Sequence, residues 1–348
     1  MQTDFSASSQ RSQGSVVVVV LGLVMLAAFF LSQFIERSMT EMLVESRARQ
    51  AERLRAQAHS ALEASLAVLA EYQALDGGLR APEQGWGQPL AGLDFFNAED
   101  TLVTVEIEDE SGRLSLPRIR ERDLVAWGRA SGLKETEATR LADAFLTWTR
   151  RDHSSPRVEA DPRNYEYEDP PHRPPGRPIE SFAELAAIAG AREFFYQPDG
   201  QPTSRLEDLR RNVSLHDFPV ANLNAASPAT LLLAGLDQAQ VDLITDYRAG
   251  KGARPAGAPP YFRSMAEVKS LLGPTALLAG FDTLARCLRL RVSVQEGSTA
   301  FHLTAAVAPA IEDVSATGLT EGLPDLRYPF RVLAYEENIE LAAAPIRS

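Results

Sequence analysis

The sequence predicts an α+β protein in which a long N-terminal helix precedes an antiparallel sheet, and a large helical segment is inserted into that sheet. Three observations predict this arrangement. An apolar run of helical length lies near the start of the chain, strand-like alternation occurs at residues 101–108 and again from residue 288, and the residues between them have helical patterns. A helical segment with strands on both sides is most simply an insertion into one sheet.

The apolar run from Val16 to Leu31 contains no charged residue. Phe34 and Ile35 extend it, so the segment reaches the ~20 residues that an α-helix needs to cross a bilayer. Leucines continue beyond it without a small-residue cleavage site, which argues against a secretory signal sequence. We therefore predict one membrane-spanning helix from Ser15 that continues as an amphipathic stem to residue 76. An uncleaved signal anchor is the alternative for this stretch.

Composition sets the class of protein. The 348 residues are 45% hydrophobic and 24% charged, as in a folded protein with one or two globular domains after the stem. A net charge of −12 argues against a general nucleic-acid binder, which needs a basic face. Cys287 is the only cysteine, so no intramolecular disulfide can form, and we interpret it as a small buried hydrophobic residue.

The first strand-like segment, residues 101–108, alternates apolar and polar residues. A turn at 109–112 leads into 113–117, and this pattern predicts a β-hairpin. The carboxylates here are interpreted as a charged outer face and turn rather than as catalytic groups; they are Glu106, Glu108, Asp109 and Glu110.

The chain returns to strands after residue 285. Residues 288–294 alternate, Glu296-Gly297 form a turn, and residues 300–307 run back. A last strand is predicted at residues 330–335.

Between these strands, residues 118–284 contain a repeat. A Gly-Leu pair followed by a helix opens each unit, and the letters Ser, Ala, Glu and Gly then recur in register in residues 181–190 and 264–273. Two copies of one helical module explain the pattern. The predicted helical-hairpin residues are Gly132, Leu133, Gly235 and Leu236.

The start of the chain resembles the N terminus of type IV pilins and type II secretion pseudopilins, because an apolar helix follows a short polar leader directly after a glycine. The resemblance implies cleavage after Gly14 by the prepilin peptidase, with Ser15 as the first mature residue. Most members of these families carry Glu at the fifth mature position, whereas this chain has Val19. A carboxylate at such depth costs ~2.5 to 3.5 kcal/mol unless it pairs with a neighbouring subunit's terminal amine, so a subunit with no neighbour above it needs none.

The order of the elements, with the Gly14 start and the missing Glu, resembles the type II secretion minor pseudopilin K, or general secretion pathway protein K. Three motifs of that family carry the resemblance: D-E-x-G-R-L, L-A-D-A before a Trp, and N-x-N-x-A-x-P-x-x-L. They are matched here by residues 109–114, by residues 141–144 with Trp148, and by Asn222, Asn224, Ala226, Pro228 and Leu231. The resemblance covers nearly the whole chain from Gly14.

These positions also have a plain physical interpretation. Asn222, Asn224 and Ser227 are of the types that bond their own backbone in turns, and Ser227-Pro228 is a helix start with Pro in the first turn. Asp143 lies inside a predicted helix, where we expect a solvated or capping role. Nothing at these positions requires a ligand.

The resemblance implies a domain organisation and a function. The expected parts are a leader (1–14), a transmembrane and stem helix (15–76), a pilin-like antiparallel sheet in two parts (77–117 and 285–348), and an inserted α-helical domain of two helix-hairpin-helix or SAM-like modules (118–284). We expect a non-enzymatic, single-pass inner-membrane protein with its globular part in the periplasm, which caps the tip of a pseudopilus in protein export. Expected partners are other minor pseudopilins, inner-membrane secretion platform proteins, the prepilin peptidase and membrane lipid. A related type IV pilus-like machine is the alternative to a type II secretion system.

Members of this family carry an acidic pattern after the Trp that is associated with calcium. Here Arg150 takes the first acidic position, Asp152 keeps the second, and Val158-Glu159 replace the start of the next segment. Calcium requires six to eight oxygen ligands. Asp152 and Glu159 are therefore calcium candidates, a solvated acidic loop is the alternative, and no cofactor is required.

A second resemblance gives the alternative function. The N-x-N-x-A pattern before a Gly-centred helical hairpin also resembles the helix-hairpin-helix of competence DNA receptors, which would make the chain a membrane-anchored DNA-binding protein. Such hairpins direct backbone N–H groups at phosphates with basic residues beside them. Asp237 would meet a phosphate with like charge, whereas Lys134 is compatible. We expect no nucleic-acid partner.

An enzyme is the third class considered. The histidines are scattered without ligand spacing, and no nucleophile motif, P-loop or dinucleotide fingerprint occurs. We therefore predict no active site. The histidines are His59, His153, His172, His216 and His302.

Overall fold

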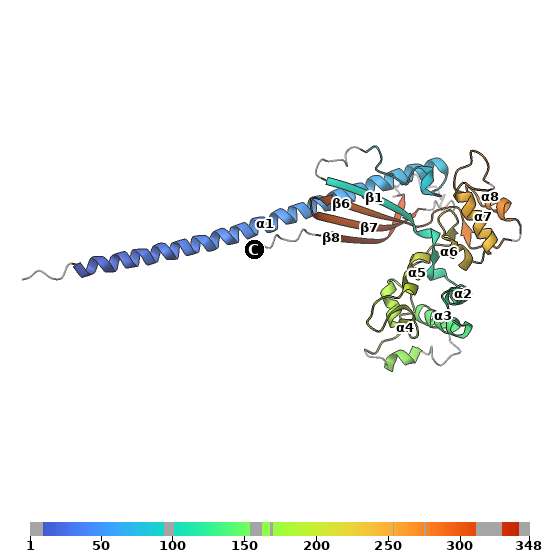
Figure 1. Ribbon diagram of the computed structural model, residues 1–348, viewed down its shortest axis with the longest axis horizontal. Helices are drawn as coiled ribbons and strands as arrows, with labels where there is room; N and C mark the ends of the chain where they lie inside the picture. The colour runs from blue at the N-terminus through green and yellow to red at the C-terminus, as the bar shows by residue number, and fades with distance from the viewer. Residues whose placement is uncertain are drawn as a thin grey trace, which may run out of the picture. The chain divides into compact units, whose positions relative to one another are not determined.

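The computed structural model shows an α+β protein, as predicted (Figure 1). The chain divides into two units, residues 1–57 and 58–348, and each is described by itself. The structure describes residues 10–93, 101–153, 162–167, 170–252, 254–274, 276–310 and 329–340.

Helix α1 spans Gln10–Asp76, and its part up to Gln57 belongs to the first unit. The side chains from Val16 to Ile35 are exposed, and the most apolar stretch has a mean hydropathy of 2.6 with none of it buried in protein. The helix is thus long and apolar enough to cross a membrane. The predicted helix is confirmed, although it begins before Ser15, and it ends where Gly77 takes a φ of 67°.

One antiparallel sheet of four strands, in the order β1-β6-β7-β8, forms part of the second unit. The predicted strands are confirmed, and the turn at Glu296-Gly297 joins the second to the third. The first strand pairs with one that follows the whole helical segment, so the helices are inserted into the sheet. The strands are β1 (Thr101–Asp109), β6 (Leu288–Glu296), β7 (Thr299–Pro309) and β8 (Phe330–Glu340).

The hairpin predicted between residues 101–108 and 113–117 is wrong. The edge of β1 is taken by β6, in which every second residue from Leu288 to Val294 is fully buried. A 3-10 turn, η3 (Glu110–Gly112), sends the chain away from the sheet instead. Two-residue strands follow: β2 (Leu114–Ser115) pairs in parallel with β3 (Val213–Ser214), and β4 (Ala221–Asn222) with β5 (Phe281–Asp282).

The last part of α1, from Ala58 onward, packs within the second unit. Ala58, Ala61 and Leu69 are completely buried there. His59 Nε2 lies 2.9 Å from Glu337 Oε1 on β8, which places this part of the helix against the sheet.

The inserted segment contains two separate hydrophobic cores. The first core is centred on Trp127, Phe145 and Phe195, and the second on Ile244 and Phe262. The helices around the first are α2 (Glu121–Ala130), α3 (Glu135–Thr149), α4 (Arg192–Phe195) and α5 (Ser204–Asn212), with the 3-10 segments η4 (Leu116–Arg118), η6 (Pro162–Tyr167) and η7 (Phe182–Ala187); those around the second are α6 (Pro228–Leu233), α7 (Gln238–Arg248) and α8 (Met265–Leu272).

Helix capping explains two of the four recurring residues, Ser and Glu. Ser181 Oγ accepts the N–H of Ala183 at 3.2 Å at the start of η7, and Ser264 Oγ accepts that of Glu267 at 3.4 Å at the start of α8. The recurring glutamates reach back in the same way: Glu184 accepts the N–H of Ser181, and Glu267 that of Arg263. The sequence repeat therefore corresponds to a repeated structure, although η7 is a 3-10 helix and α8 an α-helix.

Candidate functional site

The D-E-x-G-R-L motif lies at the end of β1, where the sheet meets the helical insertion. Glu110 is 1% exposed, and its carboxylate lies between two guanidinium groups: Arg113 Nη1 is 3.1 Å from Oε1 and Arg289 Nη2 is 2.9 Å from Oε2. A buried charge is tolerated only when it is paired. The prediction of a charged outer face and turn is therefore wrong for Glu110, because the insertion covers this end of the strand.

Asp109 joins the sheet to the second helical module. Its Oδ1 accepts the N–H of Ser111 at 2.9 Å, and its Oδ2 accepts the side-chain N–H of Asn222 at 2.6 Å. The residue as a whole is partly exposed, but its carboxylate is enclosed by these partners. Burial, with a smaller contribution from the charge of Glu110, raises the pKa of Asp109 from 3.8 to about 6, although the hydrogen bonds counter the shift.

The contact region between the end of β1 and the second helical module, around Asp109 and Asn222, is called the junction below. The N-x-N motif provides its side of the second module. Asn222 also donates to the backbone oxygen of Arg80 at 2.8 Å, and its Oδ1 accepts the N–H of Asn224 at 3.0 Å, which is the expected turn. Asn224 does more than the predicted local turn: it donates to the backbone oxygens of Phe262 and Thr283 and accepts the N–H of Phe262 at 2.7 Å. It thereby ties three distant segments together.

Ser227 and Arg248 complete the start of the second module. Ser227 Oγ accepts the N–H of Thr230 at 3.0 Å, which confirms the predicted helix start. The guanidinium of Arg248 donates to the backbone oxygen of Ala226 at 2.6 Å, and burial lowers the pKa of Arg248. No sequence motif had pointed to Arg248.

Replacing Asp109 by asparagine should remove one component of the pH dependence of stability. Because the folded pKa lies above the unfolded value, this group stabilises the fold fully below about pH 4, and the stabilisation is lost as the pH rises through about 6. Asparagine at this position does not titrate, so the variant should become more stable relative to the native chain as the pH rises from about 4 to 7. At roughly 1.36 kcal/mol per pKa unit, the difference between their free energies of unfolding should change by up to about 3 kcal/mol over this range. Urea unfolding of the full chain in detergent over this pH range measures it.

Glu336→Gln, which changes an exposed carboxylate on β8, is the matched control and should follow the native pH profile. Parallel profiles for Asp109→Asn and the native chain would contradict the prediction.

The two predicted helical hairpins have the same geometry. Gly132 and Gly235 adopt φ values of 91° and 106° between their helices, where a side chain would be strained. The next N–H bonds back in the same way in both, from Leu133 to the oxygen of Gly128 at 3.0 Å and from Leu236 to that of Leu231 at 3.1 Å. The structure thus places all four hairpin residues in two equivalent turns.

The helices after these turns are capped by their own side chains. Glu137 Oε2 accepts the N–H of Lys134 at 2.9 Å, and Asp237 Oδ1 accepts that of Gln240 at 2.9 Å. A carboxylate therefore already lies where a phosphate would bind at the start of each helix.

The calcium candidates are not brought together by the described structure. Asp152 is exposed, and Glu159 lies outside the described residues. Arg150 turns away and donates to the backbone oxygen of Ile119 at 3.2 Å. Within the described ranges, no group of three or more His, Cys, Asp or Glu side chains could hold a metal ion. Calcium binding stays a prediction.

Asp143, from the L-A-D-A motif, is neither solvated nor capping, so that prediction is wrong. It is 3% exposed within α3, and its Oδ1 lies 2.7 Å from Nε2 of His153. Cys287, by contrast, is fully buried as expected, and burial raises the pKa of its thiol.

The residues predicted for processing lie near the start of α1. Gly14 and Ser15 fall within the helix, and the Val19 side chain is exposed. Cleavage after Gly14 is therefore still a prediction.

Comparisons with known proteins place this chain beside a secretion-system family. Residues 125–198 match the family model for protein K of the type II secretion system. The chain is also similar in fold to a chain in the crystal structure of the GspK-GspI-GspJ complex from the enterotoxigenic Escherichia coli type 2 secretion system, with a TM-score of 0.59 and 15% identity over 86% of this chain and 99% of that chain. Among curated proteins, none matches the chain. The resemblance to protein K is confirmed in sequence over residues 125–198, and the fold is similar over most of the chain.

Proposed function

We propose that this chain, which resembles type II secretion protein K in sequence and fold, is a structural minor pseudopilin that caps the tip of a pseudopilus in protein export across the outer membrane. One observation carries the proposal: an apolar stretch that follows Gly14 within α1 is combined with two helical modules inserted into one antiparallel sheet. In this proposal, residues 1–14 are the leader peptide and residues 118–284 are the inserted helical domain. The N-terminal helix would be the single inner-membrane span, with the globular part in the periplasm.

The proposed partners are other minor pseudopilins. The similar structure is that of a GspK-GspI-GspJ complex, so that chain assembles with two further subunits, and we propose comparable partners here. We also propose that inner-membrane platform proteins and the prepilin peptidase are partners of this chain.

The junction supports a structural rather than an enzymatic role. Its buried charges are used within the protein: Glu110 pairs with Arg113 and Arg289, and Asp109 bonds Asn222. The Asp109–Asn222 hydrogen bond links the insertion to the end of β1, and the ion pair between Glu110 and Arg289 links η3 to β6.

The alternative, DNA binding, is less well supported. Both hairpins close their helix starts with Glu137 or Asp237, and Arg129 beside the first turn lies 3.1 Å from Glu135. Retention of duplex DNA on nitrocellulose at low salt would favour this alternative over the pseudopilin.

The proposed function predicts the mature N terminus. In its own host the chain should begin at Ser15, and Gly14→Asp should leave the leader uncut, because the peptidase needs a small residue before the cleaved bond. Mass spectrometry of the purified protein decides it. Gly22→Ala is the control, since an added methyl group there meets open space within the span. A native chain that still begins at Met1 would refute the pseudopilin assignment.

A further inference from the structure

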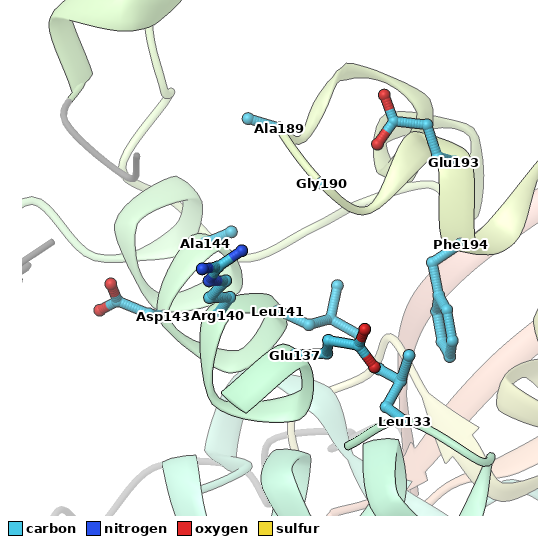
Figure 2. Close-up of a pocket in the computed structure, with 10 residues that line it drawn as sticks. All are labelled: Leu133, Glu137, Arg140, Leu141, Asp143, Ala144, Ala189, Gly190, Glu193 and Phe194. Atoms are coloured by element: carbon cyan, nitrogen blue, oxygen red, sulfur yellow. The ribbon is translucent and has the colours of Figure 1, made fainter. Parts of the chain in front are cut away.

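A groove of about 420 Å³ lies on the first helical module, between α3 and the segment that leads into α4 (Figure 2). Its volume is within the range of pockets that bind small groups. Figure 2 shows Arg140 and Ala144 on α3 across a gap from Ala189 and Gly190. The apolar lining residues are Leu133, Leu141, Ala144, Ala189 and Phe194.

The repeat explains why the groove exists. Ala144 follows Leu133 at the same spacing as Tyr247 follows Leu236 in the second module. Tyr247 is 7% exposed and stacks on Phe262 with ring centroids 4.2 Å apart, so a large buried side chain occupies this position in the second module.

The opposite wall of the groove also has a smaller side chain than its counterpart in the second module. Ala189 directly precedes the glycine that ends the recurring segment, and its counterpart in the second module is Leu272, which packs against that core. Two alanines in the first module thus replace a tyrosine and a leucine in the second. Both walls of the groove are therefore built from smaller side chains than their counterparts in the second module.

The charged side chains around the groove indicate which chemical group would bind in it. Among the described residues that line the groove, Glu137 and Glu193 are exposed carboxylates and Arg140 is the basic residue. Asp143, also at the edge, is engaged by His153. The rim is therefore net acidic above an apolar floor, and the complementary group is a cation next to an apolar side chain.

We propose that this groove docks a segment of another protein that inserts one large apolar side chain and carries a lysine or arginine beside it. The inference goes beyond the proposed function and does not depend on it. The apolar side chain would lie against Phe194 and Leu141, and the cation would face Glu193.

The test uses N-acetyl-Phe-Lys-amide as the probe, titrated against the full chain in detergent micelles and followed by saturation-transfer NMR of the peptide. It should bind about threefold to fivefold more tightly than N-acetyl-Phe-Glu-amide, as expected for one exposed ion pair. Ala189→Leu, which places the leucine of the second module in the groove, should weaken binding about tenfold by removing the apolar contact. Glu193→Lys should reverse the preference between the two peptides.

Glu336→Lys, an equal charge change on β8, is the control and should keep the native preference. Because Glu193 is exposed, its replacement leaves the fold intact, which near-ultraviolet circular dichroism checks. An unchanged preference in Glu193→Lys would overturn the proposal. So would self-association of the chain in analytical ultracentrifugation that Ala189→Leu abolishes, since the occupant would then be a second copy. Neither result would affect the processing test.

Discussion

Gly112→Ala should lower the free energy of unfolding by about 3 kcal/mol, the upper range for overpacking a closely fitted contact. Gly112 ends the turn η3, and a Cβ atom added there would lie 2.7 Å from the backbone carbon and oxygen of Ala225. Backbone atoms cannot move aside as a flexible side chain can. The methyl group would therefore separate the end of β1 from the second helical module. Urea unfolding of the full chain in detergent measures the loss.

Gly280→Ala is the matched control for this substitution. Gly280 also lies at the junction, where its backbone oxygen accepts the N–H of Ala221 at 2.9 Å, but an added methyl group there meets open space. Its effect should lie within about 1 kcal/mol of zero. Equal effects of the two variants would show that the close approach at Gly112 is not what holds the insertion on the sheet. Under the proposed function, protein export by cells that carry Gly112→Ala should fall together with stability.

Local patterns could be predicted from the sequence. The apolar run after Gly14 and the alternation in β6 each lie within one segment, so periodicity was sufficient to find them. The helical repeat was also local, because the Gly-Leu turns and the Ser and Glu caps act within a few residues.

Pairing between distant segments could not be predicted in this way. The predicted hairpin is wrong because the partner of β1 is β6, and the sequence near β1 contains no signal for pairing with a strand on the far side of the insertion. The burial of Glu110 was missed for the same reason. Arg113 lies three positions later and was a readable partner, but Arg289, which makes the burial tolerable, is on β6.

The repeat itself contains a sequence signal for the groove. Aligning the two modules at their Gly-Leu turns sets Ala144 beside Tyr247, so a missing side chain could be read from the repeat. Whether the space would collapse or remain open depended on packing around Phe194, which only the structure supplies.

The proposed place of this chain at the tip of a fibre is the part of the proposal with the largest functional consequence. Helical fibres stack subunits through a head-to-tail contact that repeats until something ends it. Val19 offers no carboxylate to a neighbour's terminal amine, and the insertion adds two modules to the sheet. Both features oppose a further subunit above this one, so we expect it only at the tip.

Cysteine crosslinking from the stem tests that position. Met42 is 70% exposed, so Met42→Cys should crosslink to other minor pseudopilins and give no crosslinks between copies of this chain. The native chain is a suitable background because Cys287 is fully buried. Leu62→Cys is the matched control, since Leu62 is 5% exposed and a thiol there should remain unreactive. Self-crosslinked dimers of Met42→Cys would show that copies of this chain lie next to each other in the fibre, and the tip placement would be wrong.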